Sequence, residues 1–589
     1  MRPQAEPRRI TLVELCLLAV AVGVVTGLGA AAFRVLVLAL YNLFFHGSLS
    51  LEHDPNAFGP PSAWGALVIL VPVVGGLLVV WIINRFAPEA RGAGVAQVMH
   101  AIYYEGGRIR PQVALTKIVA SALSIGSGAS VGREGPMVQI GSGFGSTIGG
   151  LLPLEPWQRI TLVAAGAGAG IAATFNTPLA AVLFAVELLL PEVSPRTFLP
   201  VVIATGVATH LGRLLFGAQP AFTLTGLAPP GFEDVHFLSL LSVALFGLLS
   251  GLGAGLYVLA LRFMQQRFDG LPLGPYARNA LGMLMVGVLL YGVFKLTGQY
   301  HIHGVGTATV EAVMTGGLGE PVLLFALFAL KLLATTVSLG AGASGGVFGP
   351  ALFMGATLGG AYGAAIIALT GFEDLGVGEY AMIGMASFAG GATGAAMTTI
   401  VMIFEMVRNY HVVFPAIIAT AIAIGFCRLL SKENVYTVNL AARGRNIPQE
   451  RHSNMFLVRH AEEVMSRSVV VLPAKAHLQD GLAALPASED SQYVVVADGP
   501  RIAGVLLLTP SLRALEDVHG TVTLGEIADR SFTLAPPGMS MFDVFRRMGR
   551  RKARYVLVIQ GGGVPRPEKV RGVIARAQIT DAVVDTFAA

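Results

Sequence analysis

The sequence predicts an all-α polytopic membrane domain followed by a smaller α/β domain. Of the 589 residues, 54% are hydrophobic and 13% are charged, whereas about one quarter of an ordinary soluble protein is charged. Residues 62–84 carry no charge at all, and about 20 apolar residues suffice for a membrane-spanning helix. This composition excludes a soluble enzyme, a disordered scaffold and a fibre.

The first apolar run, residues 11–46, carries only the charges of Glu14 and Arg34. It lacks a clean cleavage site and is longer than the core of a signal peptide, so we expect it to be retained. Three arginines precede it, and the positive-inside rule therefore predicts a cytoplasmic N-terminus in the plasma (inner) membrane. The formal net charge of +5 is small for this length and indicates no nucleic-acid partner.

A change in charge density near residue 446 predicts the domain organisation. Residues 446–589 hold 17 basic and 15 acidic residues, whereas 43 charges are spread over the preceding 445 residues. We therefore predict a membrane domain over 1–445, a cytoplasmic linker over 446–460 and a water-soluble domain over 461–589. The boundary is basic and contains Gly and Pro, which is typical of a cytoplasmic linker.

The soluble tail repeats one order of strands and helices twice, first from 461 and again from 524. This order resembles a tandem pair of CBS domains, which dimerise, regulate and often bind adenine nucleotides. The resemblance implies a Thr or Ser and an Asp after each last strand. The second copy has Ala and Gln there, within 572–578, and the first has Thr509 but Ser511. We expect a regulatory module that dimerises, and nucleotide binding stays open.

The membrane part also contains a repeat. Residues 117–136 and 331–350 are identical at ten of twenty positions without a gap, and 175–188 resembles 393–406, with Glu187 opposite Glu405. Two halves with the same pattern predict an internally duplicated transporter fold.

Each repeated segment ends one helix in a Gly/Ser-rich stretch and starts another near Gly-Pro, at Pro136 and Pro350. Proline suits the first turn of a helix. Free N–H groups and the helix dipole make a helix start an anion site. Non-helical backbone at membrane depth must be buried or line a cavity. The pattern therefore predicts a small anion as the cargo, although small-residue helix packing could explain isolated glycine pairs.

Residues 132–136 (Gly-Arg-Glu-Gly-Pro) and 346–350 (Gly-Val-Phe-Gly-Pro) resemble the two signature motifs of the CLC chloride channel and transporter family. A third motif of that family, usually Gly-Ser-Gly-Ile-Pro, corresponds to 92–96, and the segment 434–443 resembles the one that carries its inner-gate tyrosine, here Tyr436. The resemblance implies an inverted internal repeat, a homodimer in the lipid bilayer and one pore per subunit for chloride or another small anion.

Glu134 is an acid inside a membrane run, and such acids are functional by default. At a helix start its carboxylate can compete with the anion, so we predict that it gates the pore. The resemblance adds that protonation moves it away.

Lys117 either snorkels to the membrane surface or acts electrostatically in the pore. The anion site implied by the resemblance comprises Ala93, Gly94, Arg133, Gly135, Gly346, Val347, Phe348, Gly349 and Tyr436.

Two positions depart from the family pattern. Ala93 replaces a serine, which removes one donor to the anion, and a neutral hydrogen bond contributes roughly 1 kcal/mol. Leu188 replaces the inner glutamate of the proton-coupled exchangers, so this proton-relay position is lost. Glu187, about 100° away around a helix, is an alternative relay. We therefore predict a channel-like or weakly proton-coupled pore, with a proton-coupled chloride antiporter using a non-standard inner path as the alternative.

Other classes fit less well. An intramembrane hydrolase is disfavoured, because the sequence has no His-Glu-x-x-His motif and no paired-acid arrangement around Glu134. A sensor driven by the tail would leave the pore motifs unexplained. We therefore expect no enzyme activity, catalytic residue, metal or cofactor, apart from the adenine nucleotide left open above.

Overall fold

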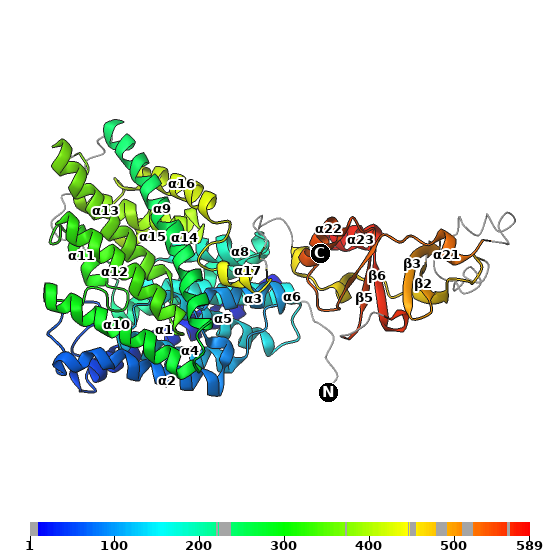
Figure 1. The fold of residues 1–589 in the computed structure, drawn as a ribbon, viewed down its shortest axis with the longest axis horizontal. Coiled ribbons are helices and arrows are strands. Elements are labelled where there is room, and N and C mark those ends of the chain that lie inside the picture. The colour runs from blue at the N-terminus through cyan, green and yellow to red at the C-terminus, as the bar shows by residue number, and fades with distance from the viewer. Residues whose placement is uncertain are drawn as a thin grey trace. The chain divides into compact units, whose positions relative to one another are not determined.

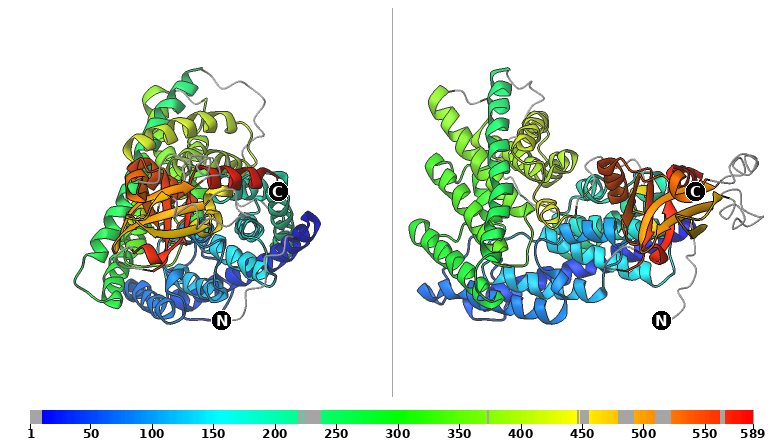
Figure 2. Two further views of the ribbon diagram at one scale, coloured as in Figure 1. Left: turned by 90° about the vertical axis from the view of Figure 1, so that its right-hand side faces the viewer. Right: turned by 45° about the vertical axis from the view of Figure 1, so that its right-hand side comes forward.

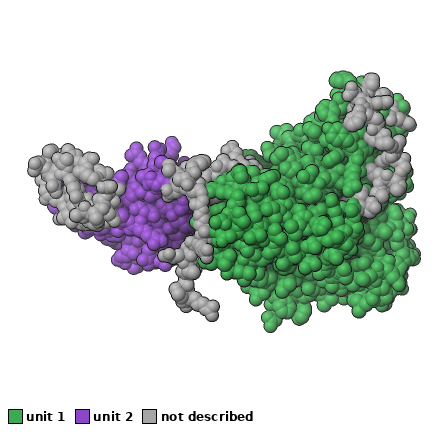
Figure 3. All heavy atoms as spheres, turned by 180° about the vertical axis from the view of Figure 1, so that it is seen from behind, with its two compact units in different colours: residues 1–449 green, residues 450–589 purple. Residues whose placement is uncertain are grey.

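The computed structural model divides into two compact units, Met1–Gln449 and Glu450–Ala589 (Figure 3). The predicted linker includes residues that the structure does not describe, so the boundaries at 445 and 461 stay predictions. The structure describes residues 10–218, 222, 237–371, 374–445, 447, 455–478, 492–508, 522–561 and 566–588.

The first unit consists of helices that occur twice in the same order (Figure 1). The first set is α1 (Leu12–His46), α2 (Val71–Phe86), α3 (Val95–Tyr104), α4 (Pro111–Gly126), α5 (Glu134–Gly150), α6 (Pro156–Phe175), α7 (Pro178–Phe184) with the π-helical turn η3 (Ala185–Leu189), and α8 (Pro195–Phe216). The second set is α9 (Phe237–Asp269), α10 (Pro275–Thr297), α11 (Thr307–Met314), α12 (Pro321–Gly340), α13 (Phe348–Thr370), α14 (Val377–Thr393), α15 (Ala396–Val407) and α16 (Val413–Leu430), followed by α17 (Val438–Ala442).

The two sets pack in the same way. α1 contacts α8 as α9 contacts α16, and α5 contacts α6 as α13 contacts α14. The equivalent residues Gly132 and Gly346 form an antiparallel bridge with N···O distances of 2.9 and 2.7 Å. The paired segments therefore run in opposite directions, and the inverted internal repeat is confirmed.

Glycines allow the inner helices to approach closely. A Cβ atom on Gly141 of α5 or on Gly166 of α6 would lie 2.0 Å from the carbonyl oxygen of the other residue. Gly355 of α13 and Gly384 of α14 make the equivalent contact in the second repeat, at 2.2 and 2.1 Å. Small residues at helix crossings are the usual packing device in a membrane.

Large apolar side chains lie on the outer surface of this unit, including Leu17, Leu28, Leu252 and Val288. Within the described residues, eight helices are long and apolar enough to cross a membrane. Figure 2 shows the same helices from two further sides. Outward-facing apolar side chains fit a surface that is covered by lipid.

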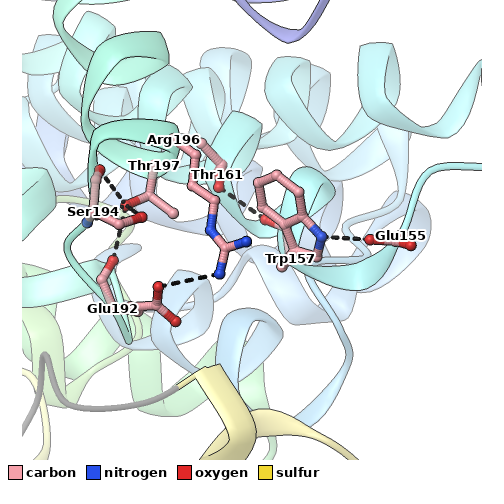
Figure 4. Close-up of polar contacts among 7 residues, drawn as sticks. All are labelled: Glu155, Trp157, Thr161, Glu192, Ser194, Arg196 and Thr197. Atoms are coloured by element: carbon pink, nitrogen blue, oxygen red, sulfur yellow. Dashed lines mark hydrogen bonds and ion pairs between the residues drawn. The ribbon is translucent and has the colours of Figure 1, made fainter. Parts of the chain in front are cut away.

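A polar corner fixes the start of α8 beside the start of α6 (Figure 4). Ser194 and Thr197 form a capping pair at the N-terminus of α8, where Pro195 occupies the first helical position. Arg196 forms an ion pair with Glu192 (3.5 Å) and lies 5.1 Å from the ring centre of Trp157. The contacts secure the turn that follows α7.

The second unit contains two three-stranded sheets with the same topology. In the first, β1 (Val469–Pro473) pairs parallel with β2 (Gln492–Asp498), which pairs antiparallel with β3 (Arg501–Leu508). In the second, β4 (Phe532–Ala535), β5 (Tyr555–Ile559) and β6 (Val570–Ile574) repeat this arrangement. The predicted α/β CBS pair is confirmed, although most of residues 477–485, where the repeated order predicts a helix of the first copy, lies outside the described residues.

Each copy of the CBS pair packs a short helix onto the core of the other. Ahead of the first sheet, η4 (Met455–Val458) and α18 (Ala461–Val464) join the core around α22 (Met541–Arg551). α21 (Leu524–Ile527) joins the core of the first sheet, and α23 (Arg576–Ala588) ends the second copy. The copies are therefore interlocked.

Candidate anion site

The starts of α5 and α13 meet where the two signature motifs come together. Gly135 packs against the carbonyl oxygen of Ala93 and the Cα atom of Gly346. A Cβ atom added to Gly135 would lie only 2.0 and 2.9 Å from these two atoms, so only glycine fits there. A Cβ on Gly94, whose φ is 93°, would lie 2.3 Å from the Gly135 carbonyl oxygen. Three predicted site segments, 92–94, 132–136 and 346–349, therefore adjoin at helix starts.

The carboxylate of Glu134 lies at the start of α13. The Gly349 N–H donates to Glu134 Oε1 at 2.5 Å, and the side chain is 3% exposed. Cβ atoms on Gly132 and Gly346 would lie 2.0 and 2.6 Å from the same oxygen, so glycine provides the space for the carboxylate. A negative group therefore occupies the positive end of the α13 dipole.

A small cavity adjoins this carboxylate. Glu134, Phe348 and Tyr436 share it, and the backbone N–H of Tyr436 donates to Asn434 Oδ1 at 2.9 Å. Three predicted site residues are thus brought together, whereas Ala93 and Gly94 contact α5 without lining the cavity. The lining residues are Val95, Glu134, Val138, Ile171, Phe175, Phe184, Phe348, Met402 and Tyr436.

Arg133 faces a different, more polar cavity. Its guanidinium lies 5.4 Å from the ring centre of Phe175, and its buried Nε has no hydrogen-bond partner among the described residues. Arg34 and Arg213 line the same cavity. Phe175 borders both cavities.

Two buried lysines hold the segments that lead into the site. Lys117 of α4 donates to the carbonyls of Ala90 (3.0 Å) and Gly92 (2.6 Å). Lys331 of α12 binds the equivalent carbonyls of 302–304, at 3.1 and 2.5 Å. Both lysines are 0% exposed, so Lys117 does not snorkel to the membrane surface. It binds backbone carbonyls beside the 92–94 turn.

Tyr257 of α9 is a site residue that the sequence did not reveal. Its hydroxyl donates to the carbonyl of Val347 at 3.1 Å, and the residue is completely buried. Val347 immediately precedes α13, so Tyr257 helps to fix the helix start that binds Glu134. A polar atom in the middle of a long apolar helix was the available signal, but the partner lies 90 residues away.

Leu188 and Glu187 lie in η3, after α7. Leu188 is 2% exposed. The Glu187 carboxylate accepts hydrogen bonds from the N–H groups of Met397 (3.3 Å) and Thr398 (2.9 Å), at the start of α15. The equivalent Glu405 accepts from the N–H groups of residues 179 and 180, at 3.1 and 2.8 Å. Each glutamate therefore caps a helix of the other repeat, and the relay role of Glu187 stays a prediction.

In the second unit, Gln578 takes the position where the CBS resemblance implies an acid. Its side-chain oxygen accepts hydrogen bonds from the Tyr493 hydroxyl (2.8 Å) and the Ala575 N–H (3.1 Å). Thr509 and Ser511, the corresponding positions of the first copy, lie outside the described residues. Nucleotide binding remains an untested prediction.

The duplicated fold and the paired helix starts define a polytopic membrane transport protein. The chain belongs to the CLC family, because the family model described as "Voltage gated chloride channel" matches residues 75–428, more than half of the chain. Anion transport is the activity of this family.

The chain is similar to two bacterial proteins named "H(+)/Cl(-) exchange transporter ClcA". The Vibrio cholerae serotype O1 protein (strain ATCC 39541) is 32% identical over 371 residues, which cover 61% of this chain and 75% of the relative. The Vibrio vulnificus protein (strain YJ016) is 28% identical over 459 residues, which cover 75% and 94%.

Solved structures show the same fold. A slow cyanobacterial Cl⁻/H⁺ antiporter matches with a TM-score of 0.63 and 25% identity, over 73% of this chain and 97% of that chain. A eukaryotic CLC transporter also matches with a TM-score of 0.63, at 19% identity, over 96% and 98%. At that identity the second match shows the fold alone.

Proposed function

We propose that this protein exchanges chloride, or another small anion, for protons across the membrane, with Glu134 as the gate. The observation that carries the proposal is the bond from the Gly349 N–H to the Glu134 carboxylate. An anion at the α13 start would compete for the same N–H group and dipole. Protonation removes the negative charge of Glu134, so proton uptake and anion binding favour each other.

From Leu188, the sequence predicts a channel-like or weakly coupled pore, with the proton-coupled antiporter as the alternative. Here the antiporter becomes the main proposal. The similar bacterial proteins are named H(+)/Cl(-) exchange transporters, and one similar structure is of a Cl⁻/H⁺ antiporter. These names support coupled exchange at least as well as a channel. Under this proposal, the cytoplasmic proton reaches Glu134 without a titratable group at position 188.

A passive anion pore is the second candidate, and Leu188 favours it. A leucine cannot carry a proton, and the Glu187 carboxylate is bound at the start of α15. The remaining route for a proton would be water in the cavity beside Glu134.

One experiment separates the two candidates. The purified protein is reconstituted in liposomes with a steep anion gradient, and external pH and anion concentration are recorded together. Uphill proton movement at a fixed anion-to-proton ratio supports the antiporter, whereas anion flux without it supports the passive pore. Absence of flux for chloride, bromide, nitrate, fluoride and bicarbonate would contradict both.

We infer further that the protein is a homodimer with both termini in the cytoplasm of an inner membrane. The basic N-terminal segment and the charged tail support the cytoplasmic termini, and membership of the CLC family supports the homodimer. Cross-linking in native membranes and protease access to the tail in right-side-out and inverted vesicles test these inferences. A monomer, or a tail cleaved from outside, would contradict them.

A further inference from the structure

The helix α22 of the second unit and the three residues that follow it carry an unusual concentration of positive charge. Residues 541–554 contain six basic residues and one acidic residue, whereas the other 130 residues of 446–589 contain 11 basic and 14 acidic residues. The tail is therefore locally basic in a background of net negative charge.

The fold turns this charge outward. Met541 and Val544 of α22 are buried in the core of the second copy, with Met548 packed against that core. The solvent-facing side of α22 carries cations over its last turns, of which Arg546 is half-buried and the others are exposed. We name this face the basic surface, and it comprises Arg546, Arg547, Arg550, Arg551 and Lys552.

The basic surface is poorly neutralised from within the chain. Arg546 lies 4.0 Å from Asp543, and Arg547 donates to the carbonyl of Leu534 at 2.6 Å. Arg550, Arg551 and Lys552 have no acidic partner within 4 Å among the described residues.

The helix dipole does not account for the whole surface. It favours cations in the last turn of α22. However, Arg546 with Arg550, and Arg547 with Arg551, are like-charged pairs at i,i+4 spacing, which destabilise a helix. An external anionic surface would offset this repulsion.

We propose that the basic surface binds the anionic lipid headgroups of the bilayer face to which the second unit is tethered. The 13 peptide units from Ala442, the end of α17, to Met455, the start of η4, can span at most about 45 Å. The second unit therefore stays near the membrane, which gives the lipid a high effective concentration. Clusters of four to eight basic residues near a membrane typically bind anionic lipid. A nucleic acid would have to be recruited from solution without this advantage.

A fluorophore on the surface tests the proposal in the full-length protein. Gly549 is exposed, and a Cβ there would have no heavy atom within 4 Å, so Gly549→Cys provides the attachment point. Cys16 and Cys427 are replaced by alanine. The labelled protein is reconstituted in phosphatidylcholine vesicles with or without phosphatidylglycerol, each containing a headgroup-attached nitroxide quencher.

We expect quenching that requires phosphatidylglycerol and is relieved by high salt, because exposed charges are screened. Combining Arg547→Gln, Arg550→Gln and Arg551→Gln should weaken the association about a hundredfold. Combining Lys475→Gln, Arg501→Gln and Arg576→Gln removes the same charge elsewhere in the unit and should retain quenching. Replacing the three surface arginines with lysine should also retain it, which separates charge from folding.

Three results would overturn the proposal. One is equal quenching with and without phosphatidylglycerol. Another is an equal loss in the two glutamine triple variants. The third is binding of a short RNA through the basic surface without any response to phosphatidylglycerol. None of these readouts uses anion flux, so they are independent of the proposed transport function.

Discussion

The Glu134 carboxylate occupies the start of α13, and under the proposed function a transported anion would bind there. Replacing it with Glu134→Gln removes the charge and the titration but keeps the size of the side chain. We expect anion flux that no longer depends on pH and is at least as fast as that of the wild type at neutral pH. The measurement is anion efflux from liposomes over a range of pH.

The control for Glu134 is Glu105→Gln, since Glu105 is exposed and forms its ion pair with His100 (3.5 Å). This variant should keep the wild-type profile, in which flux rises as the pH falls and Glu134 becomes protonated. A Glu134→Gln protein that keeps this rise would contradict the gate.

Tyr257 should set anion affinity through the α13 start. Tyr257→Phe removes one of the two hydrogen bonds that the buried Val347 carbonyl accepts and leaves the one from the Ala351 N–H. Such a loss costs about 0.5–1.5 kcal/mol. We expect a several-fold higher chloride concentration for half-maximal flux, with a smaller change in maximal flux. Tyr362→Phe is the matched control, because it removes a tyrosine hydroxyl that donates to the carbonyl of Ser242. An equal effect of both variants would show that Tyr257 acts only through stability.

A single site residue could be predicted from the sequence only where it lies in a recognisable motif. Glu134, Phe348 and Tyr436 lie in recognisable motifs, and the structure places all three around one cavity. Tyr257 has no such motif, because its partner is a carbonyl on a distant segment. The function of Lys117 could not be decided either, since its acceptors, two backbone carbonyls, leave no trace in the sequence.

The α5–α6 crossing depends on the absence of side chains. Gly166→Ala would place a methyl group 2.0 Å from the carbonyl oxygen of Gly141. This overpacking should cost about 1–3 kcal/mol. We expect a lower midpoint of thermal unfolding in detergent, followed by the loss of monodisperse protein.

Gly206→Ala on α8 provides the contrast, because no heavy atom lies within 4 Å of a Cβ there. Replacing this glycine should be neutral or stabilising, since glycine inside a helix costs roughly 0.5–1 kcal/mol relative to alanine. Equal destabilisation by the two substitutions would contradict the close crossing.

The two reciprocal caps separate a structural role of Glu187 from a role in proton transfer. Glu187→Gln and Glu405→Gln each remove a charge from the N-terminus of a helix in the other repeat, and such a charge contributes about 0.3–1 kcal/mol. If both are only caps, each variant lowers stability slightly and leaves the anion-to-proton ratio unchanged. A ratio altered by Glu187→Gln alone would assign Glu187 to the proton path. Thermal unfolding and paired flux measurements provide the two readouts.

The alignment of the two repeats predicted that Glu187 and Glu405 are equivalent. The same alignment predicted that the helices of both repeats follow one another in the same order. The reciprocal capping did not follow, because sequence alone cannot distinguish parallel from inverted repeats. The reciprocal bonds show a two-fold relation between the repeats, which becomes visible only in the structure.

For the whole molecule, the antiporter proposal raises the question of how a proton crosses between Glu134 and the inner face. Phe184, on α7, lines the cavity beside Glu134, and Leu188 lies four residues further along the same helical segment. Residues four apart occupy neighbouring positions on one helix face. Under the antiporter proposal, position 188 is a candidate point on the route of a proton from the inner side, and leucine offers a proton no site there.

Leu188→Glu places a titratable group at that position. If transport is limited by proton supply, uphill proton movement driven by a steep chloride gradient should become faster than in the wild type, while chloride flux changes less. Leu188→Gln is the matched control, because it adds a polar group of the same size that cannot titrate, and it should leave proton movement at the wild-type rate. Both variants must elute as monodisperse protein, since a polar group that is buried without partners is destabilising. Unchanged proton movement in a folded Leu188→Glu protein would place the proton path elsewhere, whereas faster movement would show that Glu134 receives its proton along the α7 side of the cavity.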